Sequence, residues 1–492
     1  MLSRTRFVSL AWVVIAVCVA GFIALHAVSR EEPNESSTTE NHSGLQVPAR
    51  LEMVGRIVIF AQQFGTGANE IAQQQIEPLT TEAAGTVSNI CGSILLARIG
   101  ASSGQPAAEG GEVARALELS QSLVARLREQ QHGAPSDVIA AAEASERVIA
   151  LIQGRAAQAA SAENGSTVGD VSGEDAQTIR SSLGWYGELL LSTWARDDAF
   201  EEGLARGAVV LGSALGIFGC VVLVAGLGGV IWLGVVAYKA LLRTLAEPLP
   251  RHTVTGSALP WTFAAWLAST TLLSLVGAMI FGMSERLSGV PALMLQIVIM
   301  LLPLTACALP VFMGVPWSTA RREMGLHDGA GWLREIGYGF VVYATAIPML
   351  VVGGVLAFLL ALLTQSDLEG ASHPIQQELF DGSAGERLML FVIAVVLAPV
   401  VEEIVFRGVL FVHLRELALR WGRFAAFAVS ALASSLIFAA MHPQGVVFIP
   451  VLGALAVAFC LAREMRGSLV SCMVAHGINN ALIVGLNVAM SA

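Results

Sequence analysis

The chain has 492 residues, of which 55% are hydrophobic and only 13% are charged. A soluble globular protein carries about a quarter charged residues, so this composition excludes an ordinary soluble protein and predicts a polytopic membrane protein. The net charge of −10 excludes a nucleic-acid-binding protein, which needs a basic face to neutralise phosphates. The six cysteines are scattered, and their spacing suits neither a disulfide framework nor a CxxC metal site.

The first apolar segment, residues 7–28, follows Arg4 and Arg6 and is long enough to cross the hydrocarbon core of a bilayer. A cleaved signal peptide has a shorter apolar core of about 7 to 15 residues. We therefore expect residues 1–28 to be an uncleaved signal anchor. The alternative is a signal peptide with a cleavage site inside VAGFIALHA.

Residues 29–206 form one long hydrophilic block with 24 acidic and 12 basic residues. Its first part, 29–47, is rich in Ser, Thr, Glu and Asn and is typical of a disordered linker. From 48–206 the composition turns rich in Ala, Glu, Gln and Arg, and Leu or Val recurs at three- and four-residue spacings within 114–130 and 136–153. This pattern predicts a domain of three or four helices, which we expect to bind a protein partner or substrate.

Eight further apolar segments follow, each long enough to cross a membrane. They cover residues 207–238, 260–282, 291–314, 337–364, 388–410, 424–442, 444–462 and 468–489. With the anchor they predict an all-α fold, a polytopic membrane helix bundle of about nine transmembrane helices with an extracytoplasmic helical domain. We divide the bundle into transmembrane helices at 207–384 and a C-terminal region at 385–492.

Basic residues gather in alternate loops, which are the cytoplasmic ones by the positive-inside rule. They are Arg4 and Arg6 before the first span, Lys239, Arg243 and Arg251 after the second, Arg321, Arg322 and Arg334 after the fourth, Arg415, Arg420 and Arg423 after the sixth, and Arg463 and Arg466 after the eighth. The acidic block and the acid-rich segment 365–387 fall in the opposite loops. We expect an integral protein of a bacterial plasma membrane, with the N-terminus inside and residues 29–206 outside.

Ionisable residues within the predicted spans are functional candidates, because a charge at bilayer depth costs about 3 kcal/mol on insertion scales. The first cluster is Glu402, Glu403 and Arg407 in APVVEEIVFRG. Glu403 and Arg407 are four residues apart on one helix face and can pair, whereas Glu402 points about 100° away and can face a cavity. Alternatively, all three form a structural ion network.

The second and third clusters contain histidines. His442 follows Phe438 by four residues, which places the phenyl ring beside the imidazole. His476 and Asn480 share a helix face by the same spacing. One intramembrane histidine, or one His–Asn pair, more often holds helices together than it binds a ligand. Together with Glu402, however, these residues predict one polar site enclosed in lipid.

Two chemistries suit such a site, and both hydrolyse a carbonyl compound. A carboxylate beside an imidazole can take a proton from water, while an amide and a second imidazole stabilise the oxyanion. Alternatively, Glu402, His442 and His476 hold a zinc ion with a fourth position left for water. The sequence contains no HExxH zinc motif and no GxSxG serine-hydrolase motif. The choice between water and metal stays open at this point.

The motifs EExxxR at 402–407, FxxxH at 438–442 and HxxxN at 476–480, in that order, resemble the motif set of the CPBP intramembrane proteases, also called the Abi or CAAX protease family. The resemblance covers about residues 385–490, roughly a fifth of the chain. The hydrophilic block 29–206 has no counterpart in the family core, and this departure puts a plain prenyl-protein substrate in doubt.

The resemblance implies an intramembrane endopeptidase that acts on a membrane-associated substrate, either prenylated or bacteriocin-like. Glu402 and His442 would activate the water, His476 and Asn480 would stabilise the oxyanion, and Glu403, Arg407 and Phe438 would support the site. The partners expected from this function are the peptide substrate and the lipid bilayer, with an extracytoplasmic protein bound through 48–206 as a further candidate.

Two other functions compete with this one. The first is a catalytically silent membrane scaffold or bacteriocin self-immunity protein, in which the polar cluster only holds helices together. The second is a transporter, which would contain repeated broken helices, but the earlier spans contain no second EExxxR or HxxxN pattern. No motif residue has been lost, and this favours the protease.

One conflict remains between the predicted spans and the predicted site. Glu402 and His476 lie well inside their spans, but His442 ends the span 424–442, and Pro443 marks either a tight hairpin or a broken helix. For the three side chains to meet, that span must be shorter or more tilted, or the chain must dip inward at Pro443.

Overall fold

A computed structural model of the chain describes residues 8–16, 19, 147–148, 150–151, 173–183, 185–195, 198–242, 244, 249–250, 253–283, 289–364 and 383–491. Every regular element within these residues is a helix, which confirms the predicted all-α fold. The predicted linker 29–47 lies outside the described residues, as do most of the anchor and most of the domain predicted at 48–206.

The chain divides into two compact units, one of residues 1–33 and 219–489 and the other of residues 34–218 and 490–492. In the second unit α7 (Gly173–Leu183) packs against α8 (Trp185–Ala195), and the side chains of Ile179 and Tyr186 are buried there. The first unit contains the predicted site.

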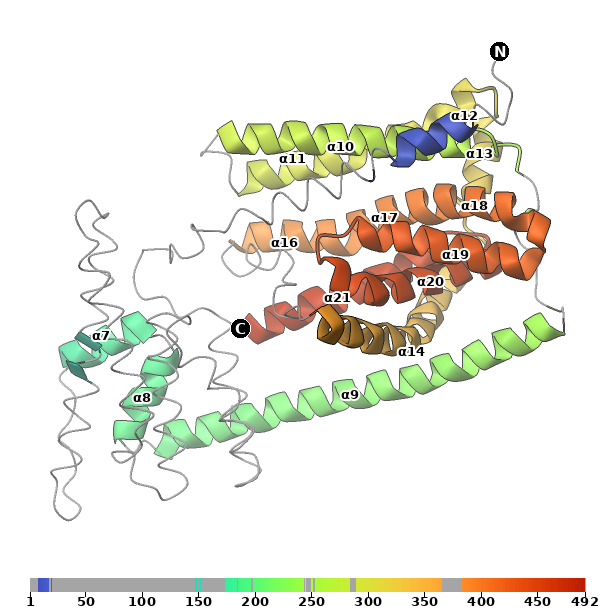
Figure 1. The fold of residues 1–492 in the computed structure, drawn as a ribbon. Coiled ribbons are helices and arrows are strands. Elements are labelled where there is room, and N and C mark those ends of the chain that lie inside the picture. The colour runs from blue at the N-terminus through green and yellow to red at the C-terminus, as the bar shows by residue number, and fades with distance from the viewer. Residues whose placement is uncertain are drawn as a thin grey trace. The chain divides into compact units, whose positions relative to one another are not determined.

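Within the described residues, twelve α-helices follow α8 in chain order. They are α9 (Asp198–Leu241), α10 (Leu259–Met283), α11 (Val290–Leu301), α12 (Leu309–Phe312), α13 (Trp317–Glu323), α14 (Trp332–Thr364), α16 (Ala384–Val392), α17 (Ala398–Glu402), α18 (Phe411–Ala418), α19 (Arg423–Ala440), α20 (Ile449–Arg466) and α21 (Val470–Ser491). Figure 1 shows α14, α20, α19 and α18 side by side, with α10 and α11 forming a second pair.

Seven helical segments among the described residues are long and apolar enough to cross a membrane. They are Gly216–Leu241, Leu259–Ile280, Val290–Phe312, Trp332–Thr364, Gly385–Trp421, Arg423–Ala440 and Val446–Arg466. Val470–Gly485 is a shorter apolar helix, and the first predicted span is only partly described. Seven of the nine predicted spans therefore have a counterpart of full length, and the protein is an integral membrane protein.

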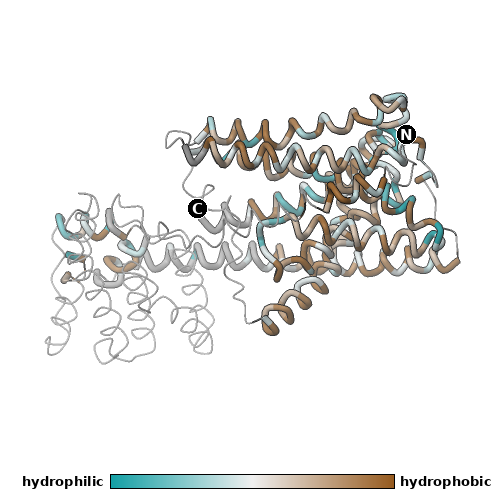
Figure 2. Tube along the Cα trace, turned by 45° about the horizontal axis from the view of Figure 1, so that its top comes forward, coloured by the Kyte–Doolittle hydropathy of each residue, from teal (hydrophilic) through white to brown (hydrophobic). Residues whose placement is uncertain are grey.

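Apolar side chains cover the outer faces of these helices. Leu223, Val224 and Ile231 on α9 are exposed by 64, 69 and 69%, and Figure 2 shows hydrophobic colour along most of the unit. A surface of this kind is unfavourable in water but suits contact with lipid chains.

Residues 384–421 form one long helix that contains two π-helical stretches. It begins with a capping box in which Ser383 and Glu386 each accept a hydrogen bond from the other's backbone N–H. The stretch η5 (Ile393–Leu397) precedes Pro399, which has no N–H to donate to the preceding turn, and η6 (Glu403–Leu410) begins at the second glutamate. Stretches of π-helix are rare and occur frequently at functional sites.

The long helix and α19 form an antiparallel hairpin. The short 3-10 helix Leu419–Trp421 ends the first arm, and Gly422 turns the chain with φ of 89°, a conformation that favours glycine. Glu402 precedes Gly422 by 20 residues, and His442 follows it by 20 residues. Because both arms are helical, equal numbers of residues bring Glu402 and His442 to about the same depth.

This hairpin resolves the conflict over His442. The span predicted at 424–442 ends earlier, at Ala440, and the next helical segment begins at Val446, so residues 441–445 form a tight turn. Figure 1 shows that this turn stops short of the first turns of α16. The long helix thus extends past the turn, and its midpoint lies beside His442.

The eighth predicted span also differs from the structure at its basic end. The prediction placed Arg463 and Arg466 in a loop after residue 462, but α20 continues to Arg466. Arg463 is fully buried, and Arg466 donates to Glu335 Oε1 at 2.5 Å. These two arginines are part of the helix packing, so the prediction that they lie in a loop was wrong.

Candidate active site

Glu402 and Glu403 lie at the junction of α17 and η6 and face different surroundings. The side chain of Glu403 is fully buried, whereas that of Glu402 is 25% exposed. Arg407 Nη1 donates a hydrogen bond to Glu403 Oε1 at 2.9 Å, as the four-residue spacing predicted. One carboxylate is therefore paired with the guanidinium, and the other is left for different partners.

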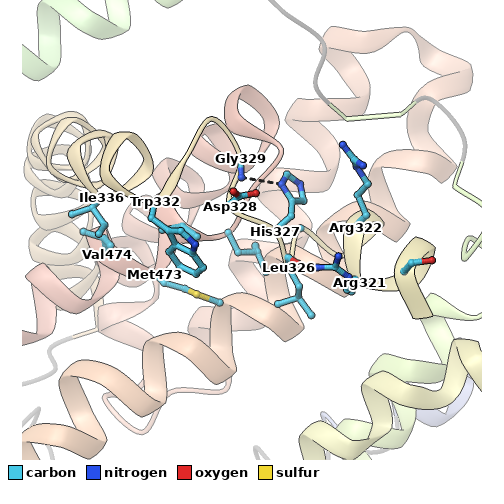
Figure 3. Close-up of a pocket in the computed structure, with 14 residues that line it drawn as sticks. Arg321, Arg322, Leu326, His327, Asp328, Gly329, Trp332, Ile336, Met473 and Val474 are labelled. Atoms are coloured by element: carbon cyan, nitrogen blue, oxygen red, sulfur yellow. Dashed lines mark hydrogen bonds between the residues drawn. The ribbon is translucent and has the colours of Figure 1, made fainter. Parts of the chain in front are cut away.

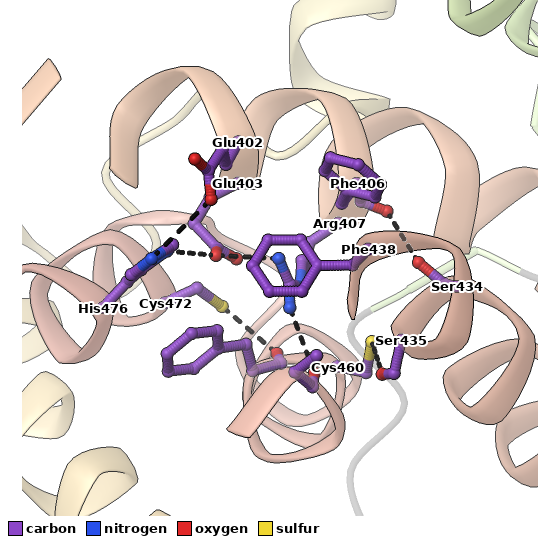
Figure 4. Close-up of polar contacts among 12 residues, drawn as sticks. Glu402, Glu403, Phe406, Arg407, Ser434, Ser435, Phe438, Cys460, Cys472 and His476 are labelled. Atoms are coloured by element: carbon purple, nitrogen blue, oxygen red, sulfur yellow. Dashed lines mark hydrogen bonds and ion pairs between the residues drawn. The ribbon is translucent and has the colours of Figure 1, made fainter. Parts of the chain in front are cut away.

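Both predicted histidines face Glu402. His476 Nε2 lies 3.7 Å and His442 Nε2 lies 3.8 Å from Glu402 Oε2. Figure 4 shows Glu402, Glu403 and His476 pointing toward one another from two separate helices. Glu402 Oε2 is buried and has no hydrogen-bond partner in the described part of the chain. Three segments far apart in the sequence thus converge on one unsatisfied carboxylate oxygen.

The partners of the other ring nitrogens determine how the two imidazoles are protonated. His442 Nδ1 lies 2.7 Å from the carbonyl oxygen of Phe438, and His476 Nδ1 lies 2.9 Å from Glu403 Oε1. Both partners accept hydrogen bonds, so each Nδ1 carries a hydrogen. When the imidazoles are neutral, the lone pairs of both Nε2 atoms therefore point toward Glu402.

Aromatic rings fix the orientation of these side chains. The Phe438 ring lies 4.3 Å from the His442 ring, centroid to centroid, which agrees with the packing predicted from their spacing. The Phe459 ring stacks on His476 at 5.1 Å with an interplanar angle of 26°. The Arg407 guanidinium lies over both phenyl rings, 4.5 Å from Phe438 and 5.1 Å from Phe459. Phe459 was missed by the sequence analysis, because nothing distinguishes it within an apolar helix.

Arg463 is a second residue that the sequence analysis missed at this site. Its Nε donates to the carbonyl oxygen of Arg407 at 3.3 Å, and its Nη2 donates to that of Glu323 at 2.6 Å. A third bond goes from Nη1 to the carbonyl oxygen of Gly467. Arg463 therefore joins η6 to the ends of α13 and α20. The spacing of Arg463 from Gly467, four residues across a helix end, is the only signal in the sequence.

Asn480 contacts the first π-helical stretch. Its Nδ2 donates to the carbonyl oxygen of Ala394 at 2.8 Å, and Asn479 Nδ2 donates to its Oδ1 at 3.2 Å. The absence of an N–H on Pro399 leaves carbonyl oxygens in η5 available for such a bond. Gly477 permits this close packing, since a Cβ there would lie 2.8 Å from the carbonyl oxygen of Val395. Asn480 thus lies between α21 and η5, and no described hydrogen bond joins it to Glu402.

Glu402, His442 and His476 are the predicted ligands of a zinc ion. Glu402, His442 and His476 offer donor atoms of the right kind, and each Nδ1 has the hydrogen-bond acceptor that a metal-binding histidine needs. Zinc ligands, however, lie about 2.0–2.2 Å from the ion. Within the described residues, no group of three His, Cys, Asp or Glu side chains is placed closely enough to hold a metal ion. We therefore derive no reaction step through a metal.

Comparison with known proteins now adds to this geometry. Residues 384–482 match the family model of the Rce1-like type II CAAX prenyl endopeptidases. This segment is similar to the CAAX protease domain of the CPBP family, and the match covers about a fifth of the chain. A search of curated proteins and a search of solved structures each found no match to the chain.

The matched segment coincides with a structural segment. It begins at residue 384, where α16 begins, and ends within α21, so it contains the hairpin, α20 and most of α21. All seven predicted site residues lie inside it. The chain is an integral membrane protein whose segment near the C-terminus is similar to CAAX endopeptidases, and four-fifths of its residues lie outside that segment.

Proposed function

We propose that the chain is an intramembrane endopeptidase that hydrolyses a peptide bond in a membrane-associated substrate. The main support is the convergence of His442 Nε2 and His476 Nε2 on the unpartnered Glu402 Oε2, at 3.8 and 3.7 Å. A purely structural cluster saturates its buried polar atoms. A carboxylate and two imidazoles that leave hydrogen-bonding capacity unused at one point can instead bind and deprotonate a water molecule.

Glu402 is the general base in this proposal. Its carboxylate takes one proton from water while the water oxygen forms a bond to the carbonyl carbon of the substrate. His442 Nε2 accepts the hydrogen bond of the second water proton and orients the water. When the tetrahedral intermediate collapses, its C–N bond breaks, and Glu402 returns the proton to the leaving amine.

His476 and Asn480 stabilise the oxyanion in this proposal. Glu403 faces His476 Nδ1 at 2.9 Å, so an imidazolium there has its charge balanced by a buried carboxylate. The Nε2–H of that imidazolium is then available to the oxyanion. Asn480 has a second hydrogen on Nδ2 besides the one that it donates to Ala394. Glu403 and Arg407 act through His476 and are positioning residues.

The substrate class follows from the family likeness and from the depth of the site. The matched family consists of prenyl endopeptidases, and we propose a prenylated or bacteriocin-like peptide. Glu402 and His442 keep 25 and 21% of their side chains exposed, so a peptide backbone can reach them. For this the substrate must carry its scissile bond into the bilayer, next to its lipid or apolar anchor.

The topology proposed from the basic loops is an N-terminus inside a bacterial plasma membrane and residues 29–206 outside. The domain predicted at 48–206 would then recruit a substrate or partner on the outer side. Deletion of 48–206 should lower cleavage of the natural substrate while cleavage of a short tethered peptide stays unchanged. Unchanged cleavage of both would contradict the recruitment role.

The function can be tested with purified protein in liposomes and a library of membrane-tethered, prenylated and unprenylated peptides. Wild type should cleave a subset, and Glu402→Gln and His442→Gln should not. Glu416→Gln and His413→Gln are matched controls on the same long helix, because Glu416 accepts a hydrogen bond from Thr253 and His413 stacks on Trp12, both outside the site.

Two outcomes separate the alternatives. Equal cleavage by wild type and Glu402→Gln would contradict the proposal and favour the scaffold or immunity protein, in which the cluster is structural. If a chelator abolishes cleavage and added zinc restores cleavage, the site uses a zinc ion to activate the water.

A further inference from the structure

A second cavity, separate from the Glu402 site, lies between the loop after α13 and the first turns of α14 and α21. Its volume is about 860 Å³, within the range of small-molecule sites, and it shares no residue with the candidate active site. Figure 3 shows Arg321, Arg322 and His327 on one side of it and Trp332, Met473 and Val474 on the other. The cavity thus has a basic side and an apolar side.

Hydrogen bonds hold the loop of this cavity in place. His327 Nε2 lies 3.0 Å from the carbonyl oxygen of Gly467, and His327 Nδ1 accepts from the backbone N–H of Gly329 at 3.0 Å. Ser468 Oγ donates to the carbonyl oxygen of His327 at 2.6 Å, and Leu469 N donates to that of Gly325 at 3.1 Å. The cavity is therefore built by the fold and does not depend on a loose surface loop.

The basic side carries charge that no described carboxylate neutralises. Arg321 Nη1 lies 3.4 Å from the carbonyl oxygen of Leu326, and neither Arg321 nor Arg322 forms an ion pair among the described residues. His327 is neutral in this arrangement, because its Nδ1 accepts a hydrogen bond. Asp328 also lines the cavity, so the net charge of the lining is about +1.

The position of the cavity suits an amphiphile. It lies between the span that ends at Phe312 and the span that begins at Trp332, so it is at a membrane–water interface. Trp332 is 62% exposed, and tryptophan is enriched at such interfaces. Leu469, which precedes α21, and Val470 and Met473 on α21 add an apolar wall. A ligand that fits must combine an anionic head with a hydrocarbon part.

We propose that this cavity binds one anionic phospholipid, with its phosphate at Arg321 and Arg322 and the upper part of an acyl chain along α21. Basic pockets between transmembrane helices are known to take anionic headgroups. The proposal commits to a membrane lipid rather than a free phosphate compound, because the apolar wall is useful only to a ligand with a hydrocarbon chain.

The test is native mass spectrometry of the full chain after reconstitution in nanodiscs of equal parts phosphatidylglycerol and phosphatidylcholine. Wild type should retain one phosphatidylglycerol with a preference of about 30-fold over phosphatidylcholine, since each arginine near the phosphate contributes roughly fivefold. Arg321→Ala with Arg322→Ala should remove this preference. Arg334→Ala, which changes a basic residue outside the cavity, should keep it.

A second variant separates the cavity from general attraction of charge. Met473→Trp fills the apolar side and leaves both arginines, so it should also lose the retained lipid. Met279→Trp, at a residue that is 59% exposed on α10, makes the same change outside the cavity and should retain it. If Met473→Trp does not fold, the arginine pair, which is exposed, still decides the result.

The lipid source is tested by competition. Millimolar glycerol phosphate or inorganic phosphate should fail to displace the bound phosphatidylglycerol. Displacement by either would overturn a lipid site in favour of a soluble phosphate site. Equal retention of phosphatidylglycerol and phosphatidylcholine by wild type, or unchanged retention in the arginine variant, would overturn the proposal. None of these readouts depends on protease activity.

Discussion

The long helix 384–421 carries two buried ion pairs, and they differ in how completely their polar atoms are satisfied. Near its end Arg415 forms two bonds to Glu464, from Nε at 2.6 Å and from Nη2 at 2.9 Å, and its Nη1 donates to the carbonyl oxygen of Pro250 at 3.2 Å. At its midpoint Arg407 donates once to Glu403, from Nη1 at 2.9 Å, and its Nη2 donates to the carbonyl oxygen of Ala456 at 3.3 Å. Both pairs are buried, so solvent does not explain the difference.

The unsatisfied atoms are concentrated at the midpoint. Glu402 Oε2, Glu403 Oε2 and Arg407 Nε are buried without a hydrogen-bond partner, whereas no atom of Arg415 or Glu464 is in that state. A buried polar atom without a partner costs about 1–3 kcal/mol. The pair at Arg415 therefore stabilises the packing of α18 against α20. The cluster at Glu402 keeps polar atoms that can still form hydrogen bonds to a ligand.

The largest effect is expected from Glu402→Gln. The amide keeps the size of the side chain but removes the base, so kcat should fall by about 10³- to 10⁴-fold. Cleavage of a tethered peptide in liposomes measures this loss, with Glu416→Gln as the control on the same helix. A Glu402→Gln enzyme with more than a tenth of the wild-type kcat would mean that the midpoint is structural, as the Arg415 pair is.

Arg415→Ala should act on stability instead. It leaves Glu464 buried beside only Arg423, whose Nε is 3.7 Å from Glu464 Oε1, and breaking a buried pair costs about 3–5 kcal/mol. The apparent unfolding temperature in detergent should drop, and kcat per folded molecule should stay unchanged. Arg420→Ala is the control, because Arg420 is exposed and stacks only on Trp421. A fall in kcat per folded molecule would contradict a purely structural role for the Arg415 pair.

A smaller effect is expected from Asn480→Ala. Loss of one oxyanion donor lowers kcat by about 10²-fold, with KM little changed. Asn479→Ala should stay within about tenfold of wild type, since Asn479 only orients the neighbouring amide. If Asn480→Ala lowers the unfolding temperature and leaves kcat intact, then Asn480 only joins α21 to η5.

The smallest effect is expected at His327, in the cavity loop. Burial, with the positive charges of Arg463 and Arg322, lowers the pKa of His327 below its ordinary value of 6.5. The unfolded chain then binds a proton that the folded chain excludes. His327 therefore does not lower the free energy of unfolding above about pH 6.5, and it lowers this free energy increasingly as the pH falls below that value. The unfolding temperature of wild type should drop more between about pH 7.5 and 5.5 than that of His327→Gln. An equal drop would contradict this.

Local spacing predicted the contacts that lie within one helix. Glu403 with Arg407, and Phe438 with His442, are each four residues apart and meet as expected. The family likeness placed Glu402, His442 and His476 together, and the structure brings them within 3.8 Å. Their roles in catalysis belong to the proposed function.

Contacts between helices were not predictable in the same way. The burial of Arg463 depends on three carbonyl oxygens from separate segments, and the sequence shows only an arginine near a helix end. The end of α19 at Ala440 depends on the turn that follows, whereas hydropathy continues smoothly through Met441. Binary hydropathy patterns find apolar runs but do not locate where an apolar chain turns.

The equal lengths of the two helical arms on either side of Gly422 set the relative depth of Glu402 and His442. Each residue inserted into one arm moves Glu402 or His442 about 1.5 Å along the axis and about 100° around it. A pair of residues inserted at the same level in both arms would preserve the depth match between Glu402 and His442. The relative position of Glu402 and His442 is therefore encoded partly as a count of residues, and any change in length between them has to be symmetric about Gly422.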